Sequence, residues 1–127
     1  HEIGIDNNVI FAGVTNSIYE SIRHSKIFVL SSDYEGIPNA LIEAMSVGLP
    51  CVSTDCSPGG ARILIDHMKN GILVPCGDPD ALADAIIRLL ENKNLCDQIG
   101  TEAKKIIEKF EPERIYGLWK EFIEGRC

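Results

Sequence analysis

The stretch that decides the fold is "IFVLSSDYEGIPNALIEAMSVGLPCVSTD", residues 27–55. It opens with an apolar run at 27–32 and closes with a second one at 51–55. Between these runs, residues 38–47 carry apolar side chains at helical spacing, and the following Gly48 is typical of a helix end. This order of strand, helix and strand predicts a parallel βαβ unit, because parallel strands need a crossover connection of about this length.

The same alternation continues on both sides of this unit. Apolar runs typical of strands occur at 9–13 ("VIFAG") and 72–75 ("ILVP"), and helical patterns lie at 17–25 and 59–68. Nearly continuous apolar runs are typical of parallel strands that are covered on both faces. We therefore predict an α/β fold, with an open Rossmann-like parallel sheet of about four strands and helices on both faces.

The last third of the chain is predicted to be helical. Asp78 and Pro79 form a typical helix start, and a further helix begins at Pro112. The apolar stripe of that last helix consists of Ile115, Leu118, Trp119, Phe122 and Ile123. We interpret this stripe, like those of the preceding helices, as core packing rather than as a cofactor site.

Charge and hydropathy exclude several partners. The 127 residues carry a net charge of −7, and no basic cluster is present that would bind a nucleic-acid backbone. No apolar run approaches the ~18 residues that a membrane span requires, so we predict no nucleic-acid partner and no membrane span. Peripheral membrane association of the full-length protein stays open.

The five cysteines predict a reducing compartment. Their number is odd, they contain no Cys-x-x-Cys pair, and Cys51, Cys76 and Cys96 lie in or beside apolar runs. We interpret these three as buried, reduced thiols, which is typical of a cytoplasmic protein.

The candidate site lies between the first two strands of the opening stretch. Glu35 falls in the loop at the carboxyl end of a predicted strand, and Pro38 suits the first position of the helix that follows. On that helix, Leu41 belongs to the apolar face, whereas Asn39 and Glu43 belong to the polar face. Ligands of open α/β sheets bind beyond the carboxyl ends of the strands, and the start of a helix favours an anion.

Two carboxylates beside an anion site suit a ligand that carries hydroxyl groups on both sides of its phosphates. A nucleotide-sugar has this layout. The alternative interpretation is that Glu43 is a solvated helix residue and Glu35 an ordinary loop acid.

Two segments carry a resemblance to a known family. They are "VLSSDYEGIPNALIEAMSVGLPCVSTDCSPGG" at 29–60 and "NGILVPCGDPDALADAIIRLL" at 70–90. With the Glu-x7-Glu spacing of Glu35 and Glu43, they resemble the C-terminal, donor-binding domain of retaining family-four-type glycosyltransferases, which have the GT-B fold. The resemblance covers roughly residues 8–110.

The resemblance implies a role for each site residue. Glu35 lies beside the donor sugar and is the expected catalytic residue, and Glu43 accepts hydrogen bonds from the nucleotide ribose. The further substrate-binding positions that it implies are Gly36, Ile37, Asn39, Ala40 and Leu41. Their backbone amides contact sugar hydroxyls and the distal phosphate, and the Asn39 side chain compensates for the donor that Pro38 lacks.

The function that the resemblance implies is transfer of a sugar from a nucleoside diphosphate sugar, most simply a UDP-sugar, to an acceptor with retention. It implies no cofactor and no obligatory metal. Two other functions are compatible with the same residues: a non-catalytic module that binds nucleotides or sugars, and a nucleotide-sugar epimerase with the GT-B fold.

The resemblance also implies that residues 1–127 are part of a C-terminal domain, with the first strands and an N-terminal acceptor domain outside the chain. We therefore expect the isolated chain to be inactive. The family sheet has the order 3-2-1-4-5-6, in which 9–13 is the third strand and 27–32 the fourth. Without the strands between them, we predict that 9–13 pairs directly with 27–32 in a rearranged four-stranded sheet, or else that the edge of 27–32 stays unpaired and the protein is marginally stable and self-associates.

Overall fold

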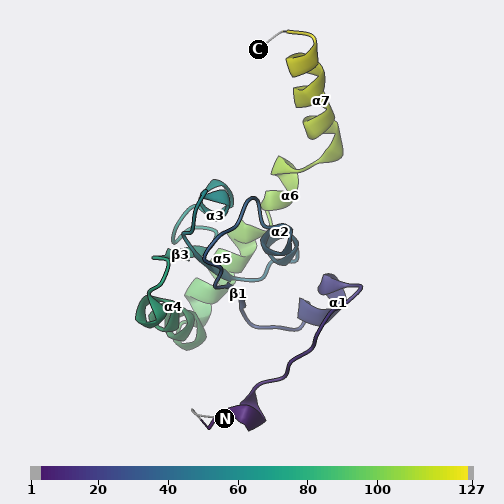
Figure 1. The fold of residues 1–127 in the computed structure, drawn as a ribbon. Coiled ribbons are helices and arrows are strands. Elements are labelled where there is room, and N and C mark those ends of the chain that lie inside the picture. Colours follow the sequence, from purple (N-terminus) through teal and green to yellow (C-terminus); the bar gives the residue numbers. More distant parts are fainter. Residues whose placement is uncertain (1–3, 126–127) are drawn as a thin grey trace.

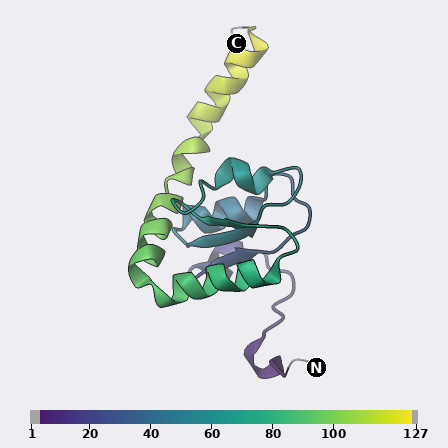
Figure 2. The same ribbon diagram turned by 90° about the vertical axis from the view of Figure 1, so that its left-hand side faces the viewer.

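A computed structural model of the chain describes residues 4–125 and shows a three-stranded parallel sheet with helices on both faces (Figures 1 and 2). The strands are β1 (Phe28–Leu30), β2 (Cys51–Thr54) and β3 (Ile72–Val74), in the order β1-β2-β3. The predicted fold class is confirmed. This order is that of the fourth, fifth and sixth strands of the family sheet.

Helices alternate with the strands and then follow them. They are η1 (Asp6–Asn8, a 3-10 helix), α1 (Ile18–Ile22), α2 (Asn39–Ser46), α3 (Gly60–Leu64), α4 (Pro79–Glu91), α5 (Lys93–Ala103), α6 (Ile106–Lys109) and α7 (Pro112–Ile123). Within the described residues, no helix is long and apolar enough to cross a membrane.

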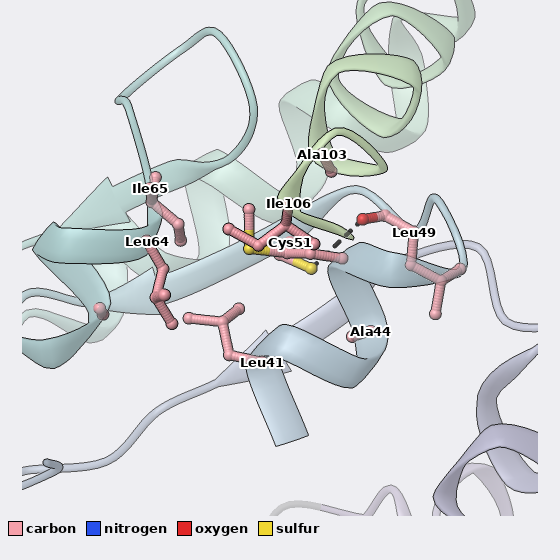
Figure 3. Packing of buried hydrophobic residues seen from close by; sticks show 10 residues of the cluster. Leu41, Ala44, Leu49, Cys51, Leu64, Ile65, Ala103 and Ile106 are labelled. Atoms are coloured by element: carbon pink, nitrogen blue, oxygen red, sulfur yellow. Dashed lines mark hydrogen bonds between the residues drawn. The ribbon is translucent and has the colours of Figure 1, made fainter. Parts of the chain in front are cut away.

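The core lies on both faces of the central strand, because successive side chains of a strand point to opposite faces. Cys51 belongs to a cluster with α2, α3 and α6, and Figure 3 shows it at the centre of that cluster with Ile106 beside it. The Cys51 thiol donates a hydrogen bond to the carbonyl of Leu49, with the two atoms 3.2 Å apart. The next residue, Val52, belongs to the cluster formed with α4 and α5.

Two predicted helix starts can be compared with the structure. The Asp78 carboxylate accepts a hydrogen bond from the Ala81 backbone N–H at 2.9 Å, and Pro79 is the first residue of α4, as predicted. Pro38, however, is the residue before α2 rather than its first helical residue. Its backbone is extended, with ψ at 109°, and its carbonyl accepts hydrogen bonds from the N–H groups of Leu41 and Ile42, the third and fourth residues of the helix.

The two faces predicted for α2 are confirmed. Leu41, Ala44 and Met45 are buried against the sheet, and Asn39 and Glu43 are exposed. The apolar period of this helix matches the face that the strands and α6 cover.

Residues 9–13 do not form the predicted strand, and the predicted pairing with 27–32 is wrong. The segment is extended but belongs to no sheet, and it runs from the body toward the amino end of the chain (Figure 1). Ile10 and Phe11 are 91% and 95% exposed. The edge of β1 that faces away from β2 is therefore unpaired in the described part of the chain. An apolar run forms a strand only where a neighbouring strand pairs with it, and 9–13 has no such neighbour among the described residues.

The core prediction for the last helix is also wrong. The stripes of α4 and α5 reach the core at Ala85, Leu89 and Ile99, but α7 extends away from the body in both views (Figures 1 and 2). Trp119 is 60% exposed, and no described residue of α7 is buried. Its apolar stripe has no element of the described chain opposite it.

Candidate functional site

The candidate site lies at the carboxyl end of the sheet, where the loops that follow β1 and β2 meet. The backbone N–H of Glu35 donates to the carbonyl of Ser57 at 3.1 Å, and Tyr34 and Ser57 form an isolated parallel bridge. The loop that carries Glu35 is therefore fixed to the loop after the central strand. This arrangement confirms that Glu35 lies beyond the carboxyl ends of the strands, where open α/β sheets bind ligands.

The Glu35 carboxylate is half-buried and held by one side chain. The hydroxyl of Ser32 donates a hydrogen bond to Glu35 Oε1, with the two oxygens 2.8 Å apart. The second carboxylate oxygen, Oε2, accepts no hydrogen bond from the residues that the structure describes. One oxygen is thus fixed by the protein, and the other is free to accept a hydrogen bond from a ligand.

Glu43 differs from Glu35 in its exposure and in its hydrogen bonding. It lies on the exposed face of α2, and its carboxylate has neither an ion pair nor a hydrogen bond within residues 4–125. Ser46, one turn later, bonds to the backbone carbonyl of Glu43 rather than to its side chain. The Glu43 carboxylate is therefore solvated, and no described residue fixes its orientation.

The other predicted site residues all lie in the loop before α2 or in its first turn. Gly36, Ile37 and Asn39 are exposed, and Ala40 is half-buried. Leu41 is placed differently, because its N–H donates to the Pro38 carbonyl at 3.1 Å and its side chain is fully buried. The structure therefore brings six of the seven predicted residues to the surface at one helix start and places Leu41 in the core beneath them.

The glycine pair Gly59 and Gly60, which follows β2, lies against the loop that carries Glu35. Gly59 has a φ of +102°, which favours glycine, and precedes α3. Gly60 is buried against the Gly36 peptide, because a Cβ on Gly60 would lie 1.4 Å from the Gly36 carbonyl oxygen. In the sequence, these two glycines open the helical pattern at 59–68. Their contact with the Glu35 loop could not be predicted from spacing, since it depends on how the two loops meet.

An ion pair lies at the same edge of the sheet. Arg62 of α3 binds the carboxylate of Asp55, which directly follows β2, through two nitrogens, and its Nη2 lies 2.7 Å from Asp55 Oδ2. This hydrogen bond and the charge of Asp55 raise the pKa of Arg62 above its ordinary value. The pair lines an open hollow of about 620 Å³ that also includes His67 and Cys76.

The cysteine predictions are confirmed for one residue and wrong for another. Cys51 is fully buried, and its burial raises the pKa of its thiol to about 12. Cys76 is exposed, because it follows β3 at the sheet edge, where its sulfur lies 3.5 Å from Asp33 Oδ1. Cys96 is half-buried, and Cys56, which was not predicted to be buried, is buried.

These features define an α/β domain with an open parallel sheet and a candidate ligand site at the carboxyl edge of that sheet. The sequence matches the family described as glycosyl transferases group 1 over residues 1–106. The chain belongs to this family. The predicted resemblance to glycosyltransferases with the GT-B fold is confirmed.

Curated relatives agree with this assignment. The chain is 29% identical to an uncharacterised glycosyltransferase of Methanocaldococcus jannaschii, with 98% of this chain and 37% of the relative covered. It is 33% identical to N-acetyl-alpha-D-glucosaminyl L-malate synthase of Bacillus anthracis, with 91% of this chain and 30% of that protein covered. The chain therefore spans about a third of the length of these relatives.

Solved structures show the same fold. The structure of Anabaena HepE in complex with UDP superposes with a TM-score of 0.91 at 25% identity, covering 98% of this chain and 34% of that chain. A Staphylococcus aureus TarM variant in complex with fondaparinux, alpha-GlcNAc-glycerol and UDP superposes with a TM-score of 0.83 at 31% identity, covering 92% of this chain and 24% of that chain.

Proposed function

We propose that this chain binds the nucleoside diphosphate part and the sugar of a UDP-sugar, and that the protein to which it belongs transfers that sugar to an acceptor with retention. The observation that carries the proposal is the placement of Glu35 and Glu43 around the start of α2, at the carboxyl edge of the sheet. The UDP complexes of HepE and TarM, which share this fold, support UDP as the nucleotide.

Each part of the site suits one part of the donor. The first backbone N–H groups of α2 and its positive dipole end favour the diphosphate. The free oxygen of Glu35 suits a sugar hydroxyl near the reacting carbon, and the solvated carboxylate of Glu43 suits the ribose hydroxyls. Charge that develops on the departing diphosphate is then stabilised by donors that are fixed before the reaction. We propose that the reaction needs no obligatory metal and takes place in the cytoplasm.

Two exposed apolar surfaces support the proposal that this chain is part of a larger protein. They are the segment 9–14 and the apolar stripe of α7, which we call the two arms. Exposed apolar patches of this kind mark surfaces that contact another protein segment or a membrane. We propose that further strands of the sheet and an N-terminal acceptor domain contact these arms, and that the chain by itself transfers no sugar.

The nucleotide site is tested by NMR titration of the 127-residue chain with UDP and UDP-glucose. We expect backbone shifts that concentrate at residues 35–43 and binding that is weak, because the chain holds only part of the donor site. Shifts that concentrate at the amino end of the strands, or no shifts at millimolar ligand, would contradict the proposal.

The catalytic role is tested in a full-length protein that contains this chain. We expect Glu35→Gln to lower kcat far more than donor affinity, because Glu35 lies at the reacting sugar rather than at the nucleotide. A variant with unchanged kcat and a raised KM would show that Glu35 only binds. Formation of an altered nucleotide-sugar without any acceptor would indicate an epimerase instead.

A further inference from the structure

We propose that Ser32 is a positioning residue, which holds the Glu35 carboxylate so that its second oxygen faces the donor sugar. The proposal rests on the proposed function, because it assigns Ser32 a role in the same site. The hydroxyl of Ser32 provides the 2.8 Å hydrogen bond to Glu35 Oε1, and no other side chain of the described residues donates to this carboxylate.

Ser32 is itself fixed to the central strand. Its backbone carbonyl accepts a hydrogen bond from the hydroxyl of Thr54, a buried residue at the end of β2. The backbone of Glu35 is fixed separately, through its bond to Ser57. Both ends of the four-residue segment 32–35 are thus attached to β2 or to the loop that follows it, so the Ser32 hydroxyl extends from a rigid base.

A hydroxyl on a rigid base gives a flexible carboxylate one orientation before any ligand binds. A free glutamate side chain loses rotamer freedom when it binds, and this loss lowers affinity. The hydrogen bond from Ser32 removes part of that freedom in advance, which is the usual function of residues that support a binding site. Glu43 has no such support, so only the sugar end of the donor meets a preorganised carboxylate.

Ser32→Ala removes the donor, Ser32→Thr keeps a hydroxyl, and Ser46→Ala is the matched control. The Ser46 hydroxyl donates a 2.7 Å hydrogen bond to the backbone carbonyl of Glu43 and donates to no carboxylate within residues 4–125. In each 127-residue variant, NMR relaxation of the Glu35 side-chain carbons measures the order of the carboxylate. Titrations with UDP and UDP-glucose measure the two affinities, and backbone amide spectra verify the fold.

We expect Ser32→Ala to increase the mobility of the Glu35 side chain and to weaken UDP-glucose binding about fivefold, which corresponds to one ordinary hydrogen bond, while UDP binding stays within about twofold of wild type. Ser32→Thr should restore both properties, and Ser46→Ala should change neither. An equally ordered Glu35 in Ser32→Ala, or equal losses for UDP and UDP-glucose, would overturn the positioning role. If wild type binds neither ligand, the proposed function fails, and the relaxation comparison still decides whether Ser32 holds Glu35.

Discussion

The body of the molecule, residues 27–106, and its two arms carry similar apolar patterns but bury them very differently. Leu41 in α2 is 0% exposed, whereas Leu118 in α7 is 54% exposed, although both lie on the apolar stripe of a helix. In the same way, Phe28 of β1 packs against the core, and Phe11 of the segment 9–14 is almost fully exposed.

This difference shows what an apolar pattern specifies. The period of a helix or strand defines which of its faces is apolar, but burial also requires another element that covers this face. In the body, α2 contacts β1, β2 and α6, so its stripe has a partner. Each arm has apolar side chains, but no element of the described chain covers them. Substitutions in the arms should therefore change the free energy of unfolding less than matched substitutions in the body.

The largest expected effect comes from matched leucine substitutions in the two regions. Leu41→Ala should lower the free energy of unfolding by about 3 kcal/mol, because it leaves a cavity in the core. Leu118→Ala should change this free energy by less than about 0.5 kcal/mol, as is usual for exposed positions. Urea denaturation followed by circular dichroism measures both. Equal losses would show that α7 packs against the body in solution.

A matched pair of glycines gives the next largest effect. Gly60→Ala should cost about 2 kcal/mol, because its Cβ forces the Gly36 peptide to move, and it should also weaken UDP binding. Gly117→Ala meets no atom within 4 Å, and in the interior of α7 it should raise helix stability by up to about 1 kcal/mol. Thermal unfolding and a UDP titration measure the two effects. Wild-type stability of Gly60→Ala would contradict the close contact between the two loops.

The smallest effect on the fold is expected from cysteine labelling. This experiment compares the reactivity of a thiol in the core with that of a thiol at the sheet edge. Iodoacetamide reacts with thiolates, and the pKa of Cys51 is about 12, so this residue should stay unmodified at pH 8. Cys76 is exposed and should react faster than Cys51, although displaced water and the nearby Asp33 raise its pKa and slow the reaction. Mass spectrometry of the labelled peptides measures both rates. Modification of Cys51 as fast as Cys76 would contradict the packing of the core.

The sequence predicted the body well because its helices and strands cover one another's apolar faces. The apolar runs at 27–32, 51–55 and 72–75 contain β1, β2 and β3, and the helix predicted at 38–47 contains α2. Strand order followed from the resemblance, and the place of Glu35 followed from the rule that loops after parallel strands share one edge.

The arms and the details of the site could not be predicted in the same way. The pattern at 9–13 is that of a strand, but its pairing partner is not encoded in the segment itself. The bond from Ser32 to Glu35 and the contact of Gly60 with Gly36 depend on the meeting of two loops. A signal for Ser32 was present, since this hydroxyl residue ends the run at 27–32, three positions before the candidate acid.

The central claim is that the exposed face of α2 holds a nucleotide, and one comparison tests it most directly. Glu43 and Glu121 are both exposed helical glutamates, but Glu43 lies in the body at the candidate site and Glu121 lies in α7. UDP titrations of Glu43→Ala and Glu121→Ala by NMR should show a loss of affinity of about tenfold for the first, because it removes hydrogen bonds to a charged acceptor, and none for the second. Equal affinities of Glu43→Ala and wild type would remove Glu43 from the site and contradict the account.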